Sequence, residues 1–334
     1  MKIPYSELLN TFETKLLAKG FAADAAAECA RLFAEATLDG VNSHGVNRFV
    51  LFCNNIDKGL INVHARPVKV KAFNALEQWD GQQGSGLNNA SFAMRRAMAL
   101  ADEFGMACVA MRNTNHWMRG GSYGLIAAQA GYMSICWSNT MPNMPVWGGD
   151  APRIGNNPLI FSLPAKPNPV LLDMSMSLYS YGKMDTCMRK GEQLPYPGGF
   201  NTDGELTSDP QSILDSWLPL SIGYWKGSGL SIMLDLFASI LSQGNSTADI
   251  GKIKEETALS QVFICIKPEK ILPDGALQAM ASEMLNYISS STPLNEGADI
   301  RYPGQRGFQF RERQLEHGVE VDDAIWQAIL ALTF

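Results

Sequence analysis

The sequence has little charge and no basic run. Asp, Glu, Lys and Arg make up 18% of its 334 residues, and its net charge is −6. Clusters of Lys and Arg supply most of the affinity of proteins for nucleic acid, so we expect no nucleic-acid partner. A small anionic substrate must then be held by a few placed cations. The low charge content is also compatible with surface that is buried in an oligomer.

Metal-site spacing, secretory patterns and membrane-spanning runs are also missing. The six cysteines form no C-x-x-C pair and lie in apolar settings, so they are expected to be buried thiols in a reducing compartment, without zinc or disulfides. The first twenty residues carry charges throughout, and no apolar run is long enough to span a bilayer. We therefore expect a cytoplasmic protein with no membrane partner and no metal.

The glycine fingerprint of ordinary dinucleotide-binding domains is absent. No G-x-G-x-x-G follows an early strand with an acidic residue about 20 positions later. If the protein binds a dinucleotide, a Rossmann domain is not the means.

Apolar spacing predicts an α/β protein with a helical layer built from both ends of the chain. Helices are expected over 8–17, 23–38, 47–58, 90–103, 123–130, 230–241, 274–287 and 319–332, and strands over 107–111, 133–137, 158–161, 169–172 and 261–266. Residues 189–224 are rich in Gly, Pro, Asp and Ser, which indicates a long, largely irregular excursion that serves as a lid or an oligomer contact. The proposed division is a helical domain of 1–70 and 285–334 and a central α/β domain of 71–284.

His44 lies in a polar, glycine-containing junction between two helical patterns, and Arg48 follows it by four residues. A guanidinium can hold a carboxylate through two parallel hydrogen bonds, and a neighbouring imidazole can give a proton to a carbonyl oxygen. The alternative is a histidine that caps a helix or bonds a backbone carbonyl. The pattern alone leaves both open.

His116 follows a predicted strand, in a segment with donors, an aromatic side chain and two glycines. Ligands of α/β sheets usually bind at strand ends. A glycine-rich turn that contains a hydrogen-bonded histidine is the alternative. His64 and His317 are in polar, turn-like contexts and are expected at the surface.

Two further segments could hold phosphate or ribose groups. Trp225 and Lys226 stand with Gly227 and Gly229 directly before the apolar helix 230–241, where backbone N–H groups and the helix dipole favour a negative charge. Asp173 follows a short strand and could bond a ribose hydroxyl. An ordinary helix start and an N-cap cluster explain the same residues equally well.

Taken together, the motifs resemble the malate/L-lactate dehydrogenase family, which is unrelated to the Rossmann-type enzymes. They are Ser-His-Gly-Val-Asn-Arg-Phe at 43–49, Asn-His-Trp-Met-Arg-Gly-Gly-Ser-Tyr-Gly at 115–124, Asn-Pro-Leu-Ile at 157–160, Asp-Met-Ser-Met-Ser at 173–177, Gly-Glu-Leu-Thr-Ser-Asp-Pro at 204–210, Gly-Tyr-Trp-Lys-Gly-Ser-Gly at 223–229 and Arg-Tyr-Pro-Gly at 301–304. They occur in colinear order over nearly the whole chain. The segments at 115–121 and 223–229 are most similar to the branch that reduces a diketo sugar acid.

This resemblance implies a helical domain, a non-Rossmann nicotinamide-binding α/β domain with a mixed sheet, and a homodimer with active sites near the subunit interface. It implies hydride transfer from NADH to C2 of 2,3-diketo-L-gulonate, with His44 as proton donor. Ser43, Arg48 and His116 are then expected to bind the substrate. The implied cofactor-binding residues are Pro169, Val170, Leu171, Leu172, Asp173, Met174, Ser175, Trp225, Lys226, Pro303, Gly304 and Gln305.

The chain departs from the family pattern at Gln305, where an acidic residue or a histidine is usual, and at Asn156, where a threonine is usual. NADPH therefore stays open as the cofactor. Other oxo-acids, such as oxaloacetate, pyruvate or a cyclic imine carboxylate, suit the His44 motif equally well. A sugar-acid-binding protein without activity is a further alternative.

Overall fold

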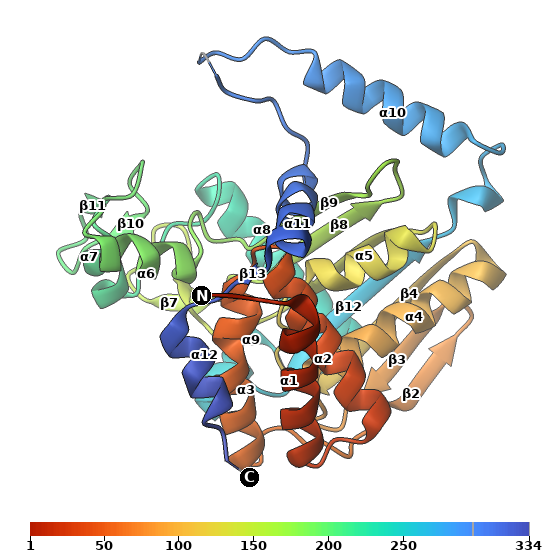
Figure 1. The fold of residues 1–334 in the computed structure, drawn as a ribbon, viewed down its shortest axis with the longest axis horizontal. Coiled ribbons are helices and arrows are strands. Elements are labelled where there is room, and N and C mark those ends of the chain that lie inside the picture. Colours follow the sequence, from red (N-terminus) through yellow and green to blue (C-terminus); the bar gives the residue numbers. More distant parts are fainter. Residues whose placement is uncertain (296, 334) are drawn as a thin grey trace.

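The computed structural model describes residues 1–295 and 297–333, which form a central sheet covered by helices (Figure 1). The sheet has seven strands in the order β2-β3-β4-β12-β5-β8-β9. Their bounds are Val68–Phe73 (β2), Leu76–Asp80 (β3), Met106–Thr114 (β4), Leu259–Ile266 (β12), Met133–Ser138 (β5), Leu159–Leu163 (β8) and Val170–Met174 (β9). Strands β3 and β4 run parallel, and the other neighbours run antiparallel. The expected mixed sheet is confirmed.

Helices cover both faces of this sheet. Val262 and Phe263 are neighbours in β12 and point to opposite faces, because side chains alternate along a strand. Phe263 belongs to an apolar cluster with residues of α4 (Gly86–Phe104) and α5 (Gly121–Gln129). Val262 belongs to a second cluster with residues of α8 (Trp225–Ser242). Burial on both sides explains why β12 is almost entirely apolar.

A helical layer from both ends of the chain packs beside the α4 face, as expected (Figure 1). It contains α1 (Tyr5–Ala18), α2 (Ala23–Leu38), α3 (Val46–Asp57), α11 (Gln305–His317) and α12 (Asp323–Leu330). The phenylalanines of its first three helices form a ring cluster, in which Phe12 stacks on Phe49 at 4.3 Å between centroids and Phe33 meets Phe52 edge-on at 5.2 Å.

The predicted helix over 319–332 is wrong at its start. Val319–Glu320 is a short strand, β13, which pairs with β1 (Lys2–Ile3) near the other end of the chain. Helix α12 begins only at Asp323, after Asp322 caps the backbone N–H groups of Ala324 and Ile325. Tertiary pairing with Ile3 therefore overrides the helical pattern.

The excursion predicted over 189–224 is largely irregular in the structure too, but it also contains short elements. The segment belongs to a small lobe with α6 (Tyr181–Lys190), β10 (Gly199–Phe200), β11 (Leu206–Thr207) and α7 (Pro210–Ser216). The buried side chains Met184, Cys187, Leu194 and Ile213 give the lobe an apolar cluster of its own. Its elements are short, so packing between them stabilises the lobe more than local propensity does.

The remaining elements are β6 (Met144–Pro145), β7 (Pro152–Ile154), α9 (Thr247–Ile253), α10 (Ala276–Ser289) and the 3-10 turns η1 (Asn42–His44) and η2 (Pro268–Lys270). Helix α10 stands apart from the main body at the top of Figure 1. No helix among the described residues is both long and apolar enough to cross a bilayer. The division of the chain at residues 70 and 285 stays a prediction.

Candidate active site

His44 ends the 3-10 turn η1, between α2 and α3. Helix α3 begins at Val46, so His44 precedes the helix that carries Arg48. Thr37 fixes this junction, because its hydroxyl accepts a hydrogen bond from the Val46 N–H at 2.9 Å. A side chain on Gly45 would collide with Thr37, which explains the glycine after His44. The sequence placed the junction correctly.

Ser43 gives His44 its nearest polar partner. The Ser43 hydroxyl lies 3.0 Å from Nδ1 of His44. A Cβ on Gly182, in the first turn of α6, would lie 3.3 Å from Cβ of Ser43. The lobe that contains α6 therefore borders the site at Ser43. Because Ser43 occupies Nδ1 of His44, Nε2 is the ring nitrogen available to a ligand.

His116 follows the end of β4, as expected from the sequence. The preceding residue anchors it, since the Asn115 amide donates to the carbonyls of Leu60, Gln83 and Gly84 at 2.9–3.1 Å. The backbone N–H of Met118 donates to Nδ1 of His116 at 3.0 Å. Nδ1 is therefore an acceptor, and the proton of the neutral ring lies on Nε2.

The two imidazoles face each other. Their ring centroids are 5.7 Å apart with 18° between the planes. Burial and the neighbouring Arg48 and His44 hold the pKa of His116 well below its ordinary value. Burial also lowers the pKa of His44, with Arg48 and Arg119 acting the same way and Asp173 opposing them. Both rings are thus neutral at neutral pH, and His44 is the one beside a carboxylate.

Arg48 has a partner that the sequence analysis missed. Its Nη2 lies 3.6 Å from Oε2 of Glu256, in the loop between α9 and β12. Burial raises the pKa of Glu256, while Arg48 and a hydrogen bond from the Met141 backbone act in the opposite direction. Glu256 follows another glutamate just before a buried strand, and its only sequence signal was that position.

A second charged cluster lies behind His44 and was also missed. The buried carboxylate of Asp39 binds the guanidinium groups of both Arg119 and Arg311. Nε of Arg119 lies 3.9 Å from Oδ2 of Asp173, which also accepts the Gly121 N–H at 2.9 Å. Asp173 therefore has structural partners at the start of α5, in addition to the ribose role that the sequence suggested.

Two of the three expected cofactor segments lie side by side. Strand β9 holds Val170 to Met174, and its Leu171 N–H donates to the Pro303 carbonyl at 3.1 Å. Gly304 has a φ of +93°, and a Cβ there would lie 3.0 Å from the Leu171 nitrogen. A glycine is thus required where 303–305 crosses the edge strand.

The third segment, Trp225 and Lys226, is exposed in the first turn of α8. The Ile222 N–H donates to the Met176 carbonyl at 2.9 Å, which ties the start of α8 to the residues after β9. The helix begins at Trp225, so the prediction that Gly227 and Gly229 precede it is wrong. Gly227 packs tightly against Ile222, and this contact explains the glycine without a phosphate.

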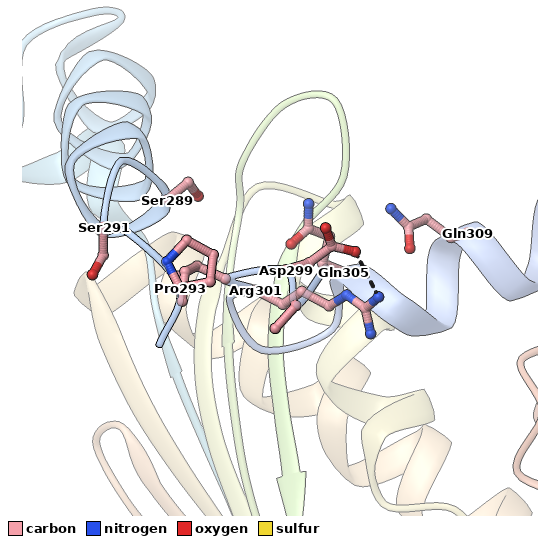
Figure 2. Close-up of a pocket in the computed structure, with 9 residues that line it drawn as sticks. Ser289, Ser291, Pro293, Asp299, Arg301, Gln305 and Gln309 are labelled. Atoms are coloured by element: carbon pink, nitrogen blue, oxygen red, sulfur yellow. Dashed lines mark hydrogen bonds and ion pairs between the residues drawn. The ribbon is translucent and has the colours of Figure 1, made fainter. Parts of the chain in front are cut away.

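A pocket of about 390 Å³ opens at the start of α11. Figure 2 shows Asp299, Arg301 and Gln305 close together there, with Gln309 further along the helix. Arg301 binds Asp299 at 2.9 Å. The side-chain oxygen of Gln305 is buried and has no hydrogen-bond partner. Such an atom needs a donor, and a bound ligand can supply one.

The other expectations concern histidines, thiols and metals. His64 and His317 are exposed, as expected. The six cysteines are free thiols, and all but Cys108 are buried. Within residues 1–295 and 297–333, no group of three His, Cys, Asp or Glu side chains could hold a metal ion.

Comparison with known proteins points to one family. The malate/L-lactate dehydrogenase family profile matches residues 3–330. The 2,3-diketo-L-gulonate reductases of Citrobacter koseri and Klebsiella pneumoniae are each 42% identical over 333 residues, which is 99% of this chain and 100% of theirs. The sulfolactate dehydrogenase of Methanocaldococcus jannaschii is 27% identical with a TM-score of 0.89, covering 98% of this chain and 95% of its own. The malate dehydrogenase of Entamoeba histolytica, at 23% identity, shares the fold with a TM-score of 0.93, covering 99% and 96%.

Proposed function

The chain belongs to the malate/L-lactate dehydrogenase family and is an oxidoreductase of oxo-acids and hydroxy-acids, and we propose that it reduces 2,3-diketo-L-gulonate to 3-keto-L-gulonate with NADH. The observation that carries this choice is the 42% identity to 2,3-diketo-L-gulonate reductases over the full length of both chains. The site supports it, because the rings of His44 and His116 face each other with the charge of Arg48 nearby, and together they suit a 2-oxo acid.

Arg48 binds the substrate carboxylate in this proposal. Its guanidinium can form two parallel hydrogen bonds to a carboxylate, which fixes the orientation of the acid as well as its position. Arg48 lowers the pKa of both histidines, which supports a position of the guanidinium near the two rings. A carboxylate on Arg48 therefore brings the adjacent C2 carbonyl towards the imidazoles.

His44 supplies the proton. When bound, NADH supplies a hydride to C2, and the proton that completes the C2 hydroxyl comes from Nε2 of protonated His44. The Ser43 hydroxyl at 3.0 Å holds Nδ1 and fixes the orientation of the ring. The negative charge of Asp173 favours the protonated form of His44, whereas burial, Arg48 and Arg119 favour the neutral form. The substrate anion adds a further negative charge that favours protonation.

His116 stays neutral and donates a hydrogen bond. Its Nδ1 is occupied by the Met118 N–H, so Nε2–H is the only free polar group of the ring. This donor can stabilise negative charge on the C2 oxygen before the proton arrives. Burial keeps the ring from competing with His44 as the acid.

The residues around the 303–305 crossing fit a nicotinamide cofactor. The buried side-chain oxygen of Gln305 has no hydrogen-bond partner and can accept a hydrogen bond from a hydroxyl or an amino group of the cofactor. The adjacent pocket of about 390 Å³ can hold one end of a dinucleotide. We assign binding of NADH to 169–175 in and beside β9, to Trp225 and Lys226 at the start of α8, and to 303–305.

The pocket favours NADH over NADPH in this assignment. Arg301 is paired with Asp299 at 2.9 Å, so an extra phosphate has to compete with this carboxylate for the arginine. A carboxylate also repels a phosphate and accepts hydrogen bonds from ribose hydroxyls. We expect Asp299→Asn to raise kcat/KM for NADPH relative to NADH, measured by absorbance with each cofactor. An unchanged ratio would remove Asp299 from this role.

The working form in this proposal is a cytoplasmic homodimer. Met284 and Tyr287 of α10 are 63% and 81% exposed, on a helix that stands apart from the body (Figure 1). Met233 and Phe237 of α8 form a second exposed apolar surface. An isolated helix of this length is marginal in water, so a second copy of the chain covering these faces explains both. Buried free thiols fit a reducing compartment.

A substrate panel tests the reaction. We expect purified protein to oxidise NADH with 2,3-diketo-L-gulonate at a higher kcat/KM than with oxaloacetate, pyruvate or Δ1-piperideine-2-carboxylate. Product analysis should give 3-keto-L-gulonate. A higher kcat/KM for another acid, or no NADH oxidation with any of them, would overturn the proposed substrate.

A further inference from the structure

Glu256 is a largely buried carboxyl group beside the arginine that holds the substrate. Its side chain is 21% exposed, and its Oε2 lies 3.6 Å from Nη2 of Arg48. The contact is an ion pair at some distance rather than a tight hydrogen bond. An acid that binds Arg48 therefore comes close to the Glu256 carboxyl group as well.

The loop that carries Glu256 is held firmly. Thr257, the next residue, is buried, and its hydroxyl lies 2.8 Å from both Gln83 Oε1 and Asn115 Oδ1. Asn115 is also the anchor of His116. On the other side of the carboxyl, the Met141 N–H donates to Glu256. The loop that carries Glu256 and the segment that carries His116 thus share an anchor in Asn115.

The charges around the substrate space nearly cancel. His44 and His116 are neutral. Arg119 is balanced by Asp39 and Asp173, and Arg48 is balanced by Glu256. A monocarboxylate brings one negative charge, which Arg48 can balance. A dicarboxylate held by Arg48 brings a second negative charge close to the Glu256 carboxylate. Buried like charges repel strongly because the screening by water is weak.

We propose that Glu256 sets the substrate class of this enzyme, accepting hydrogen bonds from the hydroxyls of a polyhydroxy monocarboxylate and rejecting dicarboxylates by charge. The hydroxyls of a sugar acid are donors that a carboxylate accepts, whereas the second carboxylate of oxaloacetate has none to offer. Specificity of this kind needs a repulsive element as well as an attractive one. The inference rests on the proposed reduction of an oxo-acid and adds the residue that selects among such acids.

Glu256→Gln tests the inference, because glutamine keeps the size and the hydrogen-bonding capacity and removes the charge. The measurement is kcat/KM for oxaloacetate divided by kcat/KM for 2,3-diketo-L-gulonate, at about pH 8, well above the ordinary pKa of a glutamate. We expect this ratio to rise on the order of 10- to 100-fold in Glu256→Gln, as removal of a repulsion between buried charges should give. A ratio unchanged within about twofold, with both substrates still turned over, would overturn the inference.

Glu255→Gln is the matched control. Glu255 is the neighbouring glutamate, is 47% exposed, and pairs with Lys58 at 3.7 Å, away from the two histidines. Its substitution should leave the ratio unchanged, and an equal rise in this variant would show that the effect is not specific to Glu256.

The wild-type protein gives a second test that requires no variant. Arg48 is the charged group that faces Glu256 from α3, and Lys58 and Glu255 pair with each other beyond it. As the pH falls and Glu256 takes up a proton, the same ratio should rise, while Glu256→Gln should show a flat ratio. A flat wild-type ratio would contradict the inference. Absence of all NADH oxidation by the wild type would instead overturn the proposed function.

Discussion

The imidazole rings of His44 and His116 lie nearly parallel with 5.7 Å between their centroids, yet they differ in the hydrogen-bond partner of Nδ1. Nδ1 of His116 accepts a backbone N–H, whereas Nδ1 of His44 meets a serine hydroxyl, which can donate or accept. The serine hydroxyl can donate to an unprotonated Nδ1 or accept from a protonated one, so its hydrogen bond to His44 is compatible with both states of the ring. A backbone N–H can only donate, so protonation of Nδ1 in His116 would break its hydrogen bond. In the proposed mechanism, His44 is therefore the ring that titrates and His116 is the ring that stays neutral.

His44→Ala should lower kcat for the oxo-acid by about 10²- to 10⁴-fold, the usual contribution of a general acid. NADH binding, measured by fluorescence titration, should persist because His44 is not one of the residues that we assign to cofactor binding. His64→Ala is the control, since His64 is exposed and outside the site. Turnover of His44→Ala close to that of His64→Ala would exclude His44 as proton donor.

The rate should depend on pH through His44. Burial lowers its pKa, so the protonated form of the free enzyme predominates only below its ordinary value of about 6.5. For reduction, kcat/KM should fall as pH rises through this depressed value. For oxidation of the hydroxy-acid, it should rise over the same range, because the neutral ring is then the base. Opposite profiles in the two directions are the expected result, and parallel profiles would argue against one group serving both.

Arg48→Lys should raise KM for the oxo-acid by about 10- to 100-fold with a smaller change in kcat, because an ammonium group cannot reproduce the paired hydrogen bonds of a guanidinium. Arg66→Lys is a matched control on an exposed pair with Asp24. Steady-state kinetics with a fixed saturating NADH concentration measure the effect. A change confined to kcat would place Arg48 outside carboxylate binding.

His116 should make the protein less stable in acid. Its folded-state pKa is well below the ordinary value, so below about pH 6.5 the unfolded chain binds a proton that the folded protein does not. The free energy of unfolding should therefore decrease as pH falls, by up to about 1.4 kcal/mol per pH unit from this group. Urea titrations at several pH values measure this slope.

The slope should be smaller in His116→Gln, which cannot titrate. The exposed His317→Gln serves as the control and should keep the wild-type slope. Equal slopes in all three proteins would show that another group causes the acid sensitivity.

The apolar face of α10 should govern assembly. Met284→Lys places a charge on a face that we assign to the second subunit, and the dimer dissociation constant should rise by about 10-fold or more. Light scattering after gel filtration gives the mass of each species. Phe73→Lys, at an exposed apolar position in β2, is the control and should stay dimeric. Identical masses for the two variants would argue against α10 as the interface.

Local patterns predicted much of the fold and the centre of the site. The glycine and polar residues around His44 separate two strongly periodic helices, and His116 follows a run of apolar strand residues, so both were visible in the sequence. Helix 23–38 was predicted with the bounds that the structure gives it. Each of these features depends on residues close together in the chain.

The features that were missed depend on contacts between distant residues. Asp39 binds Arg119 and Arg311, which are 80 and 272 positions away, so no local pattern connects them. Glu256 resembles a solvated loop residue until the fold places it beside Arg48. The β2–β3 hairpin was not expected either, because β2 is exposed along its whole length and lacks the buried face that a strand pattern needs.

The contact between Gln314 and the end of α2 has a consequence for protein synthesis. The Gln314 amide donates to the carbonyls of Thr37 and Leu38 at 3.0 and 2.7 Å, and Arg311 binds Asp39 beside them. The turn with His44 begins only a few residues later. Translation must therefore pass α11 before Asp39 can bind both of its arginines, and a chain that ends earlier leaves this buried carboxylate with Arg119 alone.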